Sequence, residues 1–161
     1  LQRGELDMAI MYDLKLDQHA VTWEPLSKSK PYVIIPPDHK YGSQETISLK
    51  ELESEEYVLF DAPGSKEYFY KLFSQVGIKP DISFRSTSLE SVRSAVGCGL
   101  GFSILTMRPP SEDCYDGNKI TSLEIRDKID PTAIVMVRSA KLEVEPLHRK
   151  FIEHCSAVIS E

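Results

Sequence analysis

The sequence lacks three features that would each place it in a particular class of protein. It has no cluster of Lys and Arg, and the formal net charge of its 161 residues is −6. Neutralising nucleic-acid phosphates requires clustered cations, so this segment is not expected to bind nucleic acid itself. No apolar run is long enough to span a bilayer and no signal peptide is visible, so we expect a cytoplasmic location.

Cysteine and histidine are also scarce. Cys98, Cys114 and Cys155 form an odd set at no spacing typical of a metal site or a redox dithiol, which favours reduced thiols. His148 and His154 are six residues apart and do not share a helix face, so they are not expected to bind a metal together. We therefore expect neither a metal nor a cofactor.

With 41% hydrophobic residues, the chain has enough apolar content to form a core. Its length suggests one domain or two small lobes. Short apolar runs predict strands at Glu5–Met11, Val33–Pro36, Tyr57–Phe60, Ile82–Arg85, Phe102–Leu105, Ile120–Ile125 and Ala133–Val137. Amphipathic spacing predicts helices at Ser65–Val76, from about Ser88 to Gly97, and from Val144 to Ile159. The strand-helix alternation between Tyr57 and Leu105 predicts right-handed crossovers and a largely parallel sheet.

The segment from Thr87 to Leu105 shows this alternation most clearly. Thr87 and Glu90 have the S/T-x-x-E form of a capping box, so Thr87 is expected to cap the helix. Gly97, Gly99 and Gly101 then favour a tight turn before the strand. These glycines follow a helix and precede a strand, the reverse of the order in a dinucleotide-binding fingerprint.

The first residues resemble the end of a helix. Leu1–Gly4 has the form of a last helical turn closed by a C′ glycine, and the strand pattern follows directly. We therefore expect an element upstream and interpret the chain as a fragment.

Five short motifs together resemble a known family. They are Gly4–Ile10, Pro37–Lys40, Ile47–Leu52, Gly77–Pro80 and Gly99–Leu105. In this order and near these separations they are similar to LysR-type transcriptional regulators, and the resemblance covers nearly the whole chain.

This resemblance implies an α/β effector-binding domain similar to type 2 periplasmic binding proteins, with a small-molecule cleft between two lobes. Two crossover strands would lie near Leu26–Val33 and Ile134–Ser139. Lobe II would then comprise residues 28–139, and residues 1–27 and 140–161 would form an incomplete lobe I. The winged helix-turn-helix through which such a regulator binds DNA is missing from this chain.

The chain departs from the family pattern in two places. His39 is followed by Lys40 instead of proline, and Thr106 and Met107 replace the proline that commonly ends the glycine-rich strand motif. Neither departure disturbs the expected fold, but both leave the class of inducer open.

Ligands of open α/β sheets bind beyond the carboxyl ends of parallel strands, where helix N-termini offer free N–H groups. Two such ends follow from the predicted elements, at Asp61–Ser65 and at Ser86–Ser88. Ser65 and Thr87 are candidates both for helix capping and for ligand contact. Ser86 and Ser88 are candidates both for a solvated turn and for contact.

The resemblance adds further candidate effector-binding residues. Pro63, Gly64 and Ser65 look like the ligand loop of lobe II, and Phe102 looks like an apolar wall of the cleft. Tyr12 and Asp13, at the end of the lobe I strand, would face them.

The charge of the effector stays open. A carboxylate is expected because helix N-termini favour anions. However, Asp13, Asp61 and Glu90 would crowd the same region with negative charge, which leaves a polar uncharged or amine-bearing effector as an alternative. Lys66 and Arg85 are the nearby cations, and surface exposure is the usual state of both residue types.

Two further hypotheses concern a helix face and a thiol. Tyr68 and Tyr70 widen the apolar sector of the Ser65–Val76 helix, which suggests a contact in a homodimer or homotetramer, as the resemblance also implies. Cys98 lies in the glycine turn and is either a packed small residue or a redox thiol.

Effector sensing for a transcription factor is thus the leading hypothesis. A solute-binding protein of a transport system would share the fold, although the chain shows no signal peptide. An enzyme is disfavoured because the sequence shows no base, metal set or cofactor motif near a nucleophile.

Overall fold

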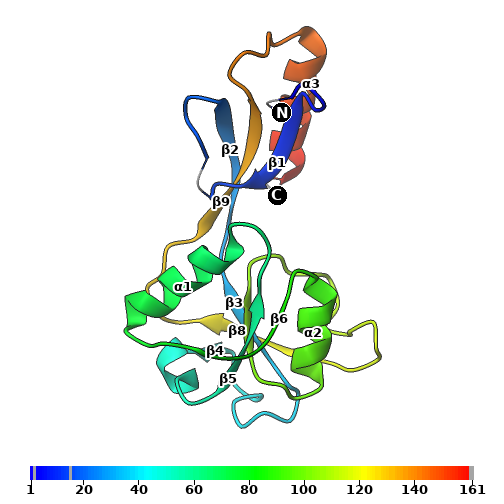
Figure 1. Cartoon of the computed structure of the whole chain (residues 1–161). Coiled ribbons are helices and arrows are strands. Elements are labelled where there is room, and N and C mark those ends of the chain that lie inside the picture. The colour runs from blue at the N-terminus through cyan, green and yellow to red at the C-terminus, as the bar shows by residue number, and fades with distance from the viewer. Residues whose placement is uncertain (2, 15, 160–161) are drawn as a thin grey trace. The chain divides into compact units, whose positions relative to one another are not determined.

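The computed structural model describes residues 1, 3–14 and 16–159. The strands are β1 (Met8–Tyr12), β2 (Val21–Ser29), β3 (Tyr32–Ile35), β4 (Thr46–Ile47), β5 (Glu56–Phe60), β6 (Asp81–Ser86), β7 (Ser103–Leu105), β8 (Thr121–Ile125) and β9 (Thr132–Ser139). The helices are a short 3-10 helix η1 (Leu49–Leu52), α1 (Ser65–Val76), α2 (Leu89–Gly97) and α3 (Pro146–Ile159). Figure 1 shows these elements along the chain.

The chain forms two compact units. The first unit contains Leu1–Ser29 and Pro131–Glu161, and the second contains Lys30–Asp130. The chain therefore passes between the units twice, after Ser29 and after Asp130. These points differ by a few residues from the predicted limits of lobe II, residues 28 and 139, and the assignment of the units to lobes stays a prediction.

The first unit is built on an antiparallel sheet with the strand order β1-β9-β2. Helix α3 packs on one face of this sheet through Ile152, Cys155 and Ile159, which contact Leu26 and Met136. Val21, Val135 and Val137 form a separate apolar cluster with Trp23. Of the predicted N-terminal helix turn, Gln2 lies outside the described residues, and Gly4 donates its N–H to the carbonyl of Leu1 in a left-handed turn.

The second unit holds a mixed sheet in the order β4-β8-β3-β7, and the parallel pair β5-β6 joins it at a bridge between Tyr57 and Phe102. The prediction of parallel strands is confirmed for β5, β6 and β7. β3 lies outside the Tyr57–Leu105 run for which parallel strands were predicted, and it pairs antiparallel with both β7 and β8.

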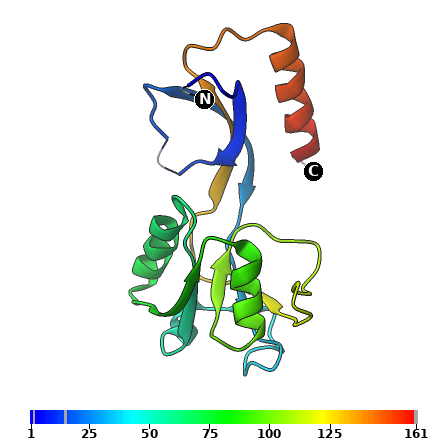
Figure 2. The same cartoon turned by 45° about the vertical axis from the view of Figure 1, so that its right-hand side comes forward.

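Helices α1 and α2 cover opposite faces of this sheet, as Figures 1 and 2 show. Phe69, Leu72 and Phe73 of α1 pack with Val33 and Ile35 on one face. On the other face, the side chains of α2 and of neighbouring segments form a second buried cluster: Tyr32, Ile34, Val58, Val92, Ala95, Val96, Leu105, Cys114 and Ile120. Successive side chains of β3 point to opposite faces of the sheet, so β3 contributes residues to both apolar clusters.

None of the helices in the described part of the chain has both the length and the apolar content needed to cross a membrane.

Candidate functional site

The candidate site is the edge of the second unit where β5 and β6 end. These strands are parallel, so their carboxyl ends and the N-termini of α1 and α2 lie at the same edge of the sheet. The N–H of Asp61 donates to the carbonyl of Ser86 at 2.8 Å, which joins the two loops directly. The structure therefore brings Asp61–Ser65 and Ser86–Ser88 together.

The N-terminus of α1 has no side-chain cap. Gly64 occupies the N-cap position at a φ of 82°, a left-handed conformation that favours glycine. Ser65 is the first helical residue, and its N–H donates to the carbonyl of Ala62 at 3.0 Å. The prediction that Ser65 caps α1 is therefore wrong, because glycine sets the turn one residue earlier. Pro63 is exposed and Ser65 is half-buried beside it.

The N-terminus of α2 is capped one residue later than predicted. Ser88 is extended, with φ −93° and ψ 124°, and its hydroxyl accepts from the N–H of Ser91 at 3.3 Å. Ser86 supports this turn, since its hydroxyl accepts from the N–H of Ser88 at 3.1 Å. The capping box predicted for Thr87 and Glu90 is wrong, because the Ser88 hydroxyl is better placed. Thr87 is exposed at the turn.

Glu90 pairs with a buried cation instead of reaching back to the cap. Arg93 Nε lies 3.0 Å from Glu90 Oε1, and Arg93 is only 2% exposed. Its Nη2 also donates to the carbonyls of Ser111 and Asp113, at 2.7 and 2.9 Å. Sequence reasoning missed Arg93, although its place four residues after Leu89 on the apolar stripe was a usable signal.

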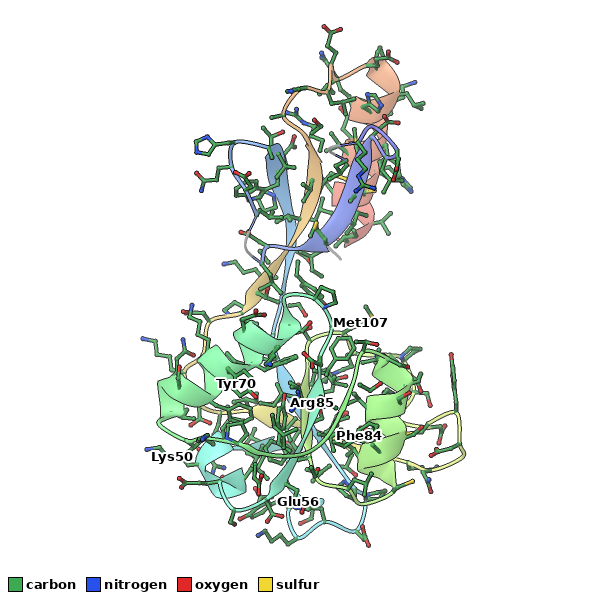
Figure 3. The ribbon with its side chains drawn as sticks, in the orientation of Figure 1. Lys50, Glu56, Tyr70, Phe84, Arg85 and Met107 are labelled. Atoms are coloured by element: carbon green, nitrogen blue, oxygen red, sulfur yellow. The ribbon has the colours of Figure 1, made fainter. Side chains whose placement is uncertain are left out.

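Both signs of charge are present at the edge. Arg85 Nη1 lies 4.0 Å from Asp61 Oδ2, and both side chains are partly exposed. Lys66 Nζ lies 5.9 Å from the centre of the Tyr70 ring on α1. Figure 3 labels Tyr70 on α1 and Phe84 and Arg85 on β6. The Asp61 carboxylate therefore has a cation close by.

Phe102 does not line an exposed surface. It is 2% exposed and packs against Tyr57 and Phe73, with ring centroids 5.2 and 6.2 Å away. Its role as a wall of the cleft is contradicted by this burial. The cause is the bridge to β5, which draws the residue into the core under α1.

The remaining predicted residues lie elsewhere. Tyr12 ends β1 in the first unit and is half-buried, while Asp13 is exposed and donates its N–H to the carbonyl of Ala133. That Tyr12 and Asp13 face the loops of the second unit remains a prediction. Tyr68 and Tyr70 are half-buried on α1, and the Tyr68 hydroxyl donates to the carbonyl of Asp130 at 3.4 Å.

The described residues bring together no group of three His, Cys, Asp or Glu side chains suited to a metal ion.

Comparison with known proteins identifies the family. The LysR substrate binding domain matches residues 1–160. The chain belongs to this family. YybE, an uncharacterized HTH-type transcriptional regulator of Bacillus subtilis (strain 168), is 29% identical over 130 residues, which are 78% of this chain and 41% of YybE.

Solved structures agree with this LysR assignment. HinK, a LysR family transcriptional regulator from Pseudomonas aeruginosa, matches with a TM-score of 0.92 and 32% identity, over 98% of this chain and 54% of the HinK chain. The effector binding domain of QuiR, solved with shikimate, matches with a TM-score of 0.84 and 17% identity, over 99% of this chain and 75% of that one. The QuiR match shows the type 2 periplasmic-binding-protein-like fold. This LysR domain therefore spans less than half of YybE and about half of HinK.

Proposed function

We propose that this chain senses a small-molecule effector for a LysR-type transcriptional regulator whose DNA-binding domain lies elsewhere in a longer protein. The observation that supports this most is the family match over residues 1–160. The family assignment disfavours a transport protein, and we propose that the chain itself catalyses no reaction. A cytoplasmic location also belongs to this proposal.

The proposal assigns the second unit to lobe II and the first unit to part of lobe I. The two points at which the chain passes between the units, after Ser29 and after Asp130, support this division. By the family resemblance, the effector binds in a cleft that both lobes line. Tyr12 and Asp13 would contribute from lobe I.

We propose that lobe II contributes the joined loops Asp61–Ser65 and Ser86–Ser88. The N-terminus of α1 has no side-chain cap, and it favours an anionic group because the helix dipole attracts negative charge there. Arg85 beside Asp61 offsets the repulsion from that carboxylate. We therefore propose a carboxylate effector, in line with the shikimate held by QuiR.

A thermal-shift screen of the longer protein tests this site, with small carboxylates in one arm and matched amines and neutral amides in the other. A ligand at 100 times its dissociation constant stabilises its protein by about 2.7 kcal/mol. We expect stabilisation only by carboxylates. Stabilisation by amines alone would leave the sensing role in place and overturn the proposed effector class. If none of these compounds binds the protein, and none of them changes transcription from the regulated promoter, the sensing role would be contradicted.

Ser65 offers a clean test of contact because it is not a helix cap. Ser65→Ala is expected to weaken effector binding with little change in the melting temperature of the free protein. Ser88→Ala is expected to cost about 1 kcal/mol of stability whether or not a ligand binds, since its hydroxyl caps α2. Ser74→Ala, at the other end of α1, is the matched control and is expected to leave effector binding unchanged. Unchanged affinity in Ser65→Ala would remove this residue from the site.

We also propose that the face of α1 bearing Tyr68 and Tyr70 contributes to a homodimer. Sedimentation of the variant with Tyr68→Asp and Tyr70→Asp is expected to show dissociation, because burying two carboxylates in an interface is costly. The exposed pair Ser74 and Gln75 gives a matched control when both are changed to Asp. Identical sedimentation of both double variants and the parent would contradict the proposal.

A further inference from the structure

The chain enters the second unit through two residues that belong to no strand. β2 ends at Ser29 in the sheet of the first unit, and β3 begins at Tyr32 in the sheet of the second. Lys30 and Pro31 lie between them in the sequence. Pro31 has no N–H and cannot donate to a strand ladder. Tyr32 is therefore the first residue of this segment that the second sheet holds.

The side chain of Tyr32 is fixed from two sides. It is only 2% exposed, and its hydroxyl donates to the carbonyl of Met107 at 2.9 Å. The guanidinium carbon of Arg108 lies over the Tyr32 ring, 4.2 Å from its centre. Tyr32 is thus covered by the two residues Met107 and Arg108, which follow β7.

Arg108 also reaches the strand on the other side of β3. Its Nη2 lies 2.6 Å from Glu124 Oε1 on β8, and β3 lies between β7 and β8 in the sheet. Glu124 is itself held in place, because its N–H donates to the carbonyl of Glu45 at 2.9 Å. Arg108 therefore spans Tyr32 from one neighbouring strand to the other. We call Tyr32, Arg108 and Glu124 the arginine clamp.

The arginine clamp is better suited to fixing a position than to stabilising the fold. The side chains of Arg108 and Glu124 are each about half exposed, and an exposed ion pair contributes little stability. A guanidinium group that is stacked on an aromatic ring and paired with a carboxylate has a defined orientation, because it is planar. We therefore expect its loss to act mainly on the end of β3.

The clamp lies at the edge of the sheet that carries the candidate site. β5, β6 and β7 are parallel, so Met107 and Arg108 follow a strand end at the same edge as the Asp61–Ser65 and Ser86–Ser88 loops. Figure 3 labels Met107, the residue before Arg108. The clamp also follows directly after Thr106, where the sequence departs from the pattern of the LysR family.

We propose that Arg108 is a positioning residue, which holds Tyr32 so that bending of the chain on its way into the second unit is confined to Lys30 and Pro31. Hinges consist of a few residues at the ends of ordered elements that absorb a change in backbone dihedral angles. The inference rests on the proposed sensing role, since a hinge matters to sensing only if the units respond to an effector. Its test needs no effector, so failure of the clamp and failure of the sensing role are distinguishable.

Amide hydrogen exchange of the free protein, followed residue by residue by NMR, tests the clamp. In Arg108→Met we expect the amides of Tyr32–Ile35 to exchange about tenfold faster, from the loss of one cation–π contact and one ion pair. The amide of Val58, which donates to the carbonyl of Phe102, is expected to exchange as in the parent. Glu124→Gln should change the same amides in the same direction.

Arg126→Met is the matched control. Arg126 is also about half exposed and pairs with Glu51 in the same unit. It should leave the exchange of Tyr32–Ile35 unchanged.

The proposal is overturned if these β3 amides exchange at the parent rate in Arg108→Met. Equal acceleration at Val58 would also overturn it, because Arg108 would then act only on overall stability. Acceleration of the β3 amides by Arg126→Met would do the same, since the loss of any exposed ion pair would be sufficient.

Discussion

Tyr57 places a hydroxyl group in the interior of the second unit, where the described residues provide no hydrogen-bond partner. Burial raises the pKa of Tyr57 far above its usual range, so the group stays neutral. Leaving a buried hydroxyl unpaired costs about 1–3 kcal/mol. We therefore expect Tyr57→Phe to preserve the ring packing and to raise the free energy of unfolding, measured by urea denaturation.

Tyr32 is the matched control for this change. It is equally buried, but its hydroxyl donates to the carbonyl of Met107 at 2.9 Å. Tyr32→Phe is expected to lower the free energy of unfolding by about 1 kcal/mol because a hydrogen bond is lost. Equal losses in both variants would show that the Tyr57 hydroxyl is bonded after all.

Glu55 gives a residue-level prediction for pH. The hydrogen bond from Lys40, 2.6 Å away, holds the pKa of the Glu55 carboxyl below its ordinary value of 4.5. A lowered folded-state pKa stabilises the protein above the unfolded-state pKa, and this contribution is lost as the pH falls through the folded-state value. The stability gap between the parent and Glu55→Gln should be constant near neutral pH and should shrink in the acid range. A gap that widens on acidification would contradict this assignment.

The join between β5 and β7 depends on a single glycine. Gly101 has a φ of 131°, and a Cβ on it would overlap the carbonyl group of Glu56. That carbonyl accepts from the N–H of Phe102 at 2.9 Å, and the N–H of Val58 donates to the Phe102 carbonyl at 2.8 Å. The close approach of the two strands therefore requires a residue without a side chain.

Gly101→Ala is expected to be much more damaging than Gly99→Ala. Gly99 also has a positive φ, of 83°, but nothing lies within 4 Å of a Cβ placed there. Gly99→Ala should cost about 1–2 kcal/mol from backbone strain alone. Gly101→Ala should cost more, because it adds an overlap worth about 1–3 kcal/mol. Similar melting temperatures for the two variants would rule out the overlap.

Arg93 links helix α2 to the segment that follows β7. Replacing it with Met leaves the Glu90 carboxylate without its cation and the carbonyls of Ser111 and Asp113 without their donor. Breaking a buried pair of this kind costs about 3–5 kcal/mol. The Lys119–Asp113 pair is largely exposed and is the control, so Lys119→Met should cost at most about 1 kcal/mol in the same denaturation experiment.

At the scale of the whole molecule, most elements could be predicted because their apolar periodicity is strong. Helix α1 was predicted with its observed limits, since Phe69, Leu72 and Phe73 share a stripe and Gly77 ends it in a left-handed conformation. The family could be predicted from five short motifs. The edge formed by the Asp61–Ser65 and Ser86–Ser88 loops followed from the parallel strands.

The failures arose where tertiary contacts decide between local alternatives. Thr87 and Ser88 both offer a capping hydroxyl, and the Ser86 turn selects Ser88. The capping box that does form is Ser48 with Glu51 on η1, where the Asp127 carboxylate also accepts from the N–H of Leu49 at 2.7 Å. Asp127 is far from Ser48 in sequence, so local patterns could not show that it would support this cap.

The second unit is one uninterrupted stretch of chain, and this predicts that it folds alone. Its sheet, its two helices and both of its apolar clusters come from Lys30–Asp130. We expect an excised segment of residues 30–130 to unfold cooperatively in urea. Non-cooperative unfolding of this segment would show that its core needs the first unit.

The strand order β1-β9-β2 has a consequence for how the protein is made. β1 and β2 leave the ribosome early, yet each pairs with β9, which is synthesised only after the whole of the second unit. The edges of β1 and β2 therefore stay unpaired while the second unit, which separates them from β9 in the sequence, is synthesised and folds. Slow translation ahead of Thr132 would lengthen this wait, and open strand edges favour aggregation.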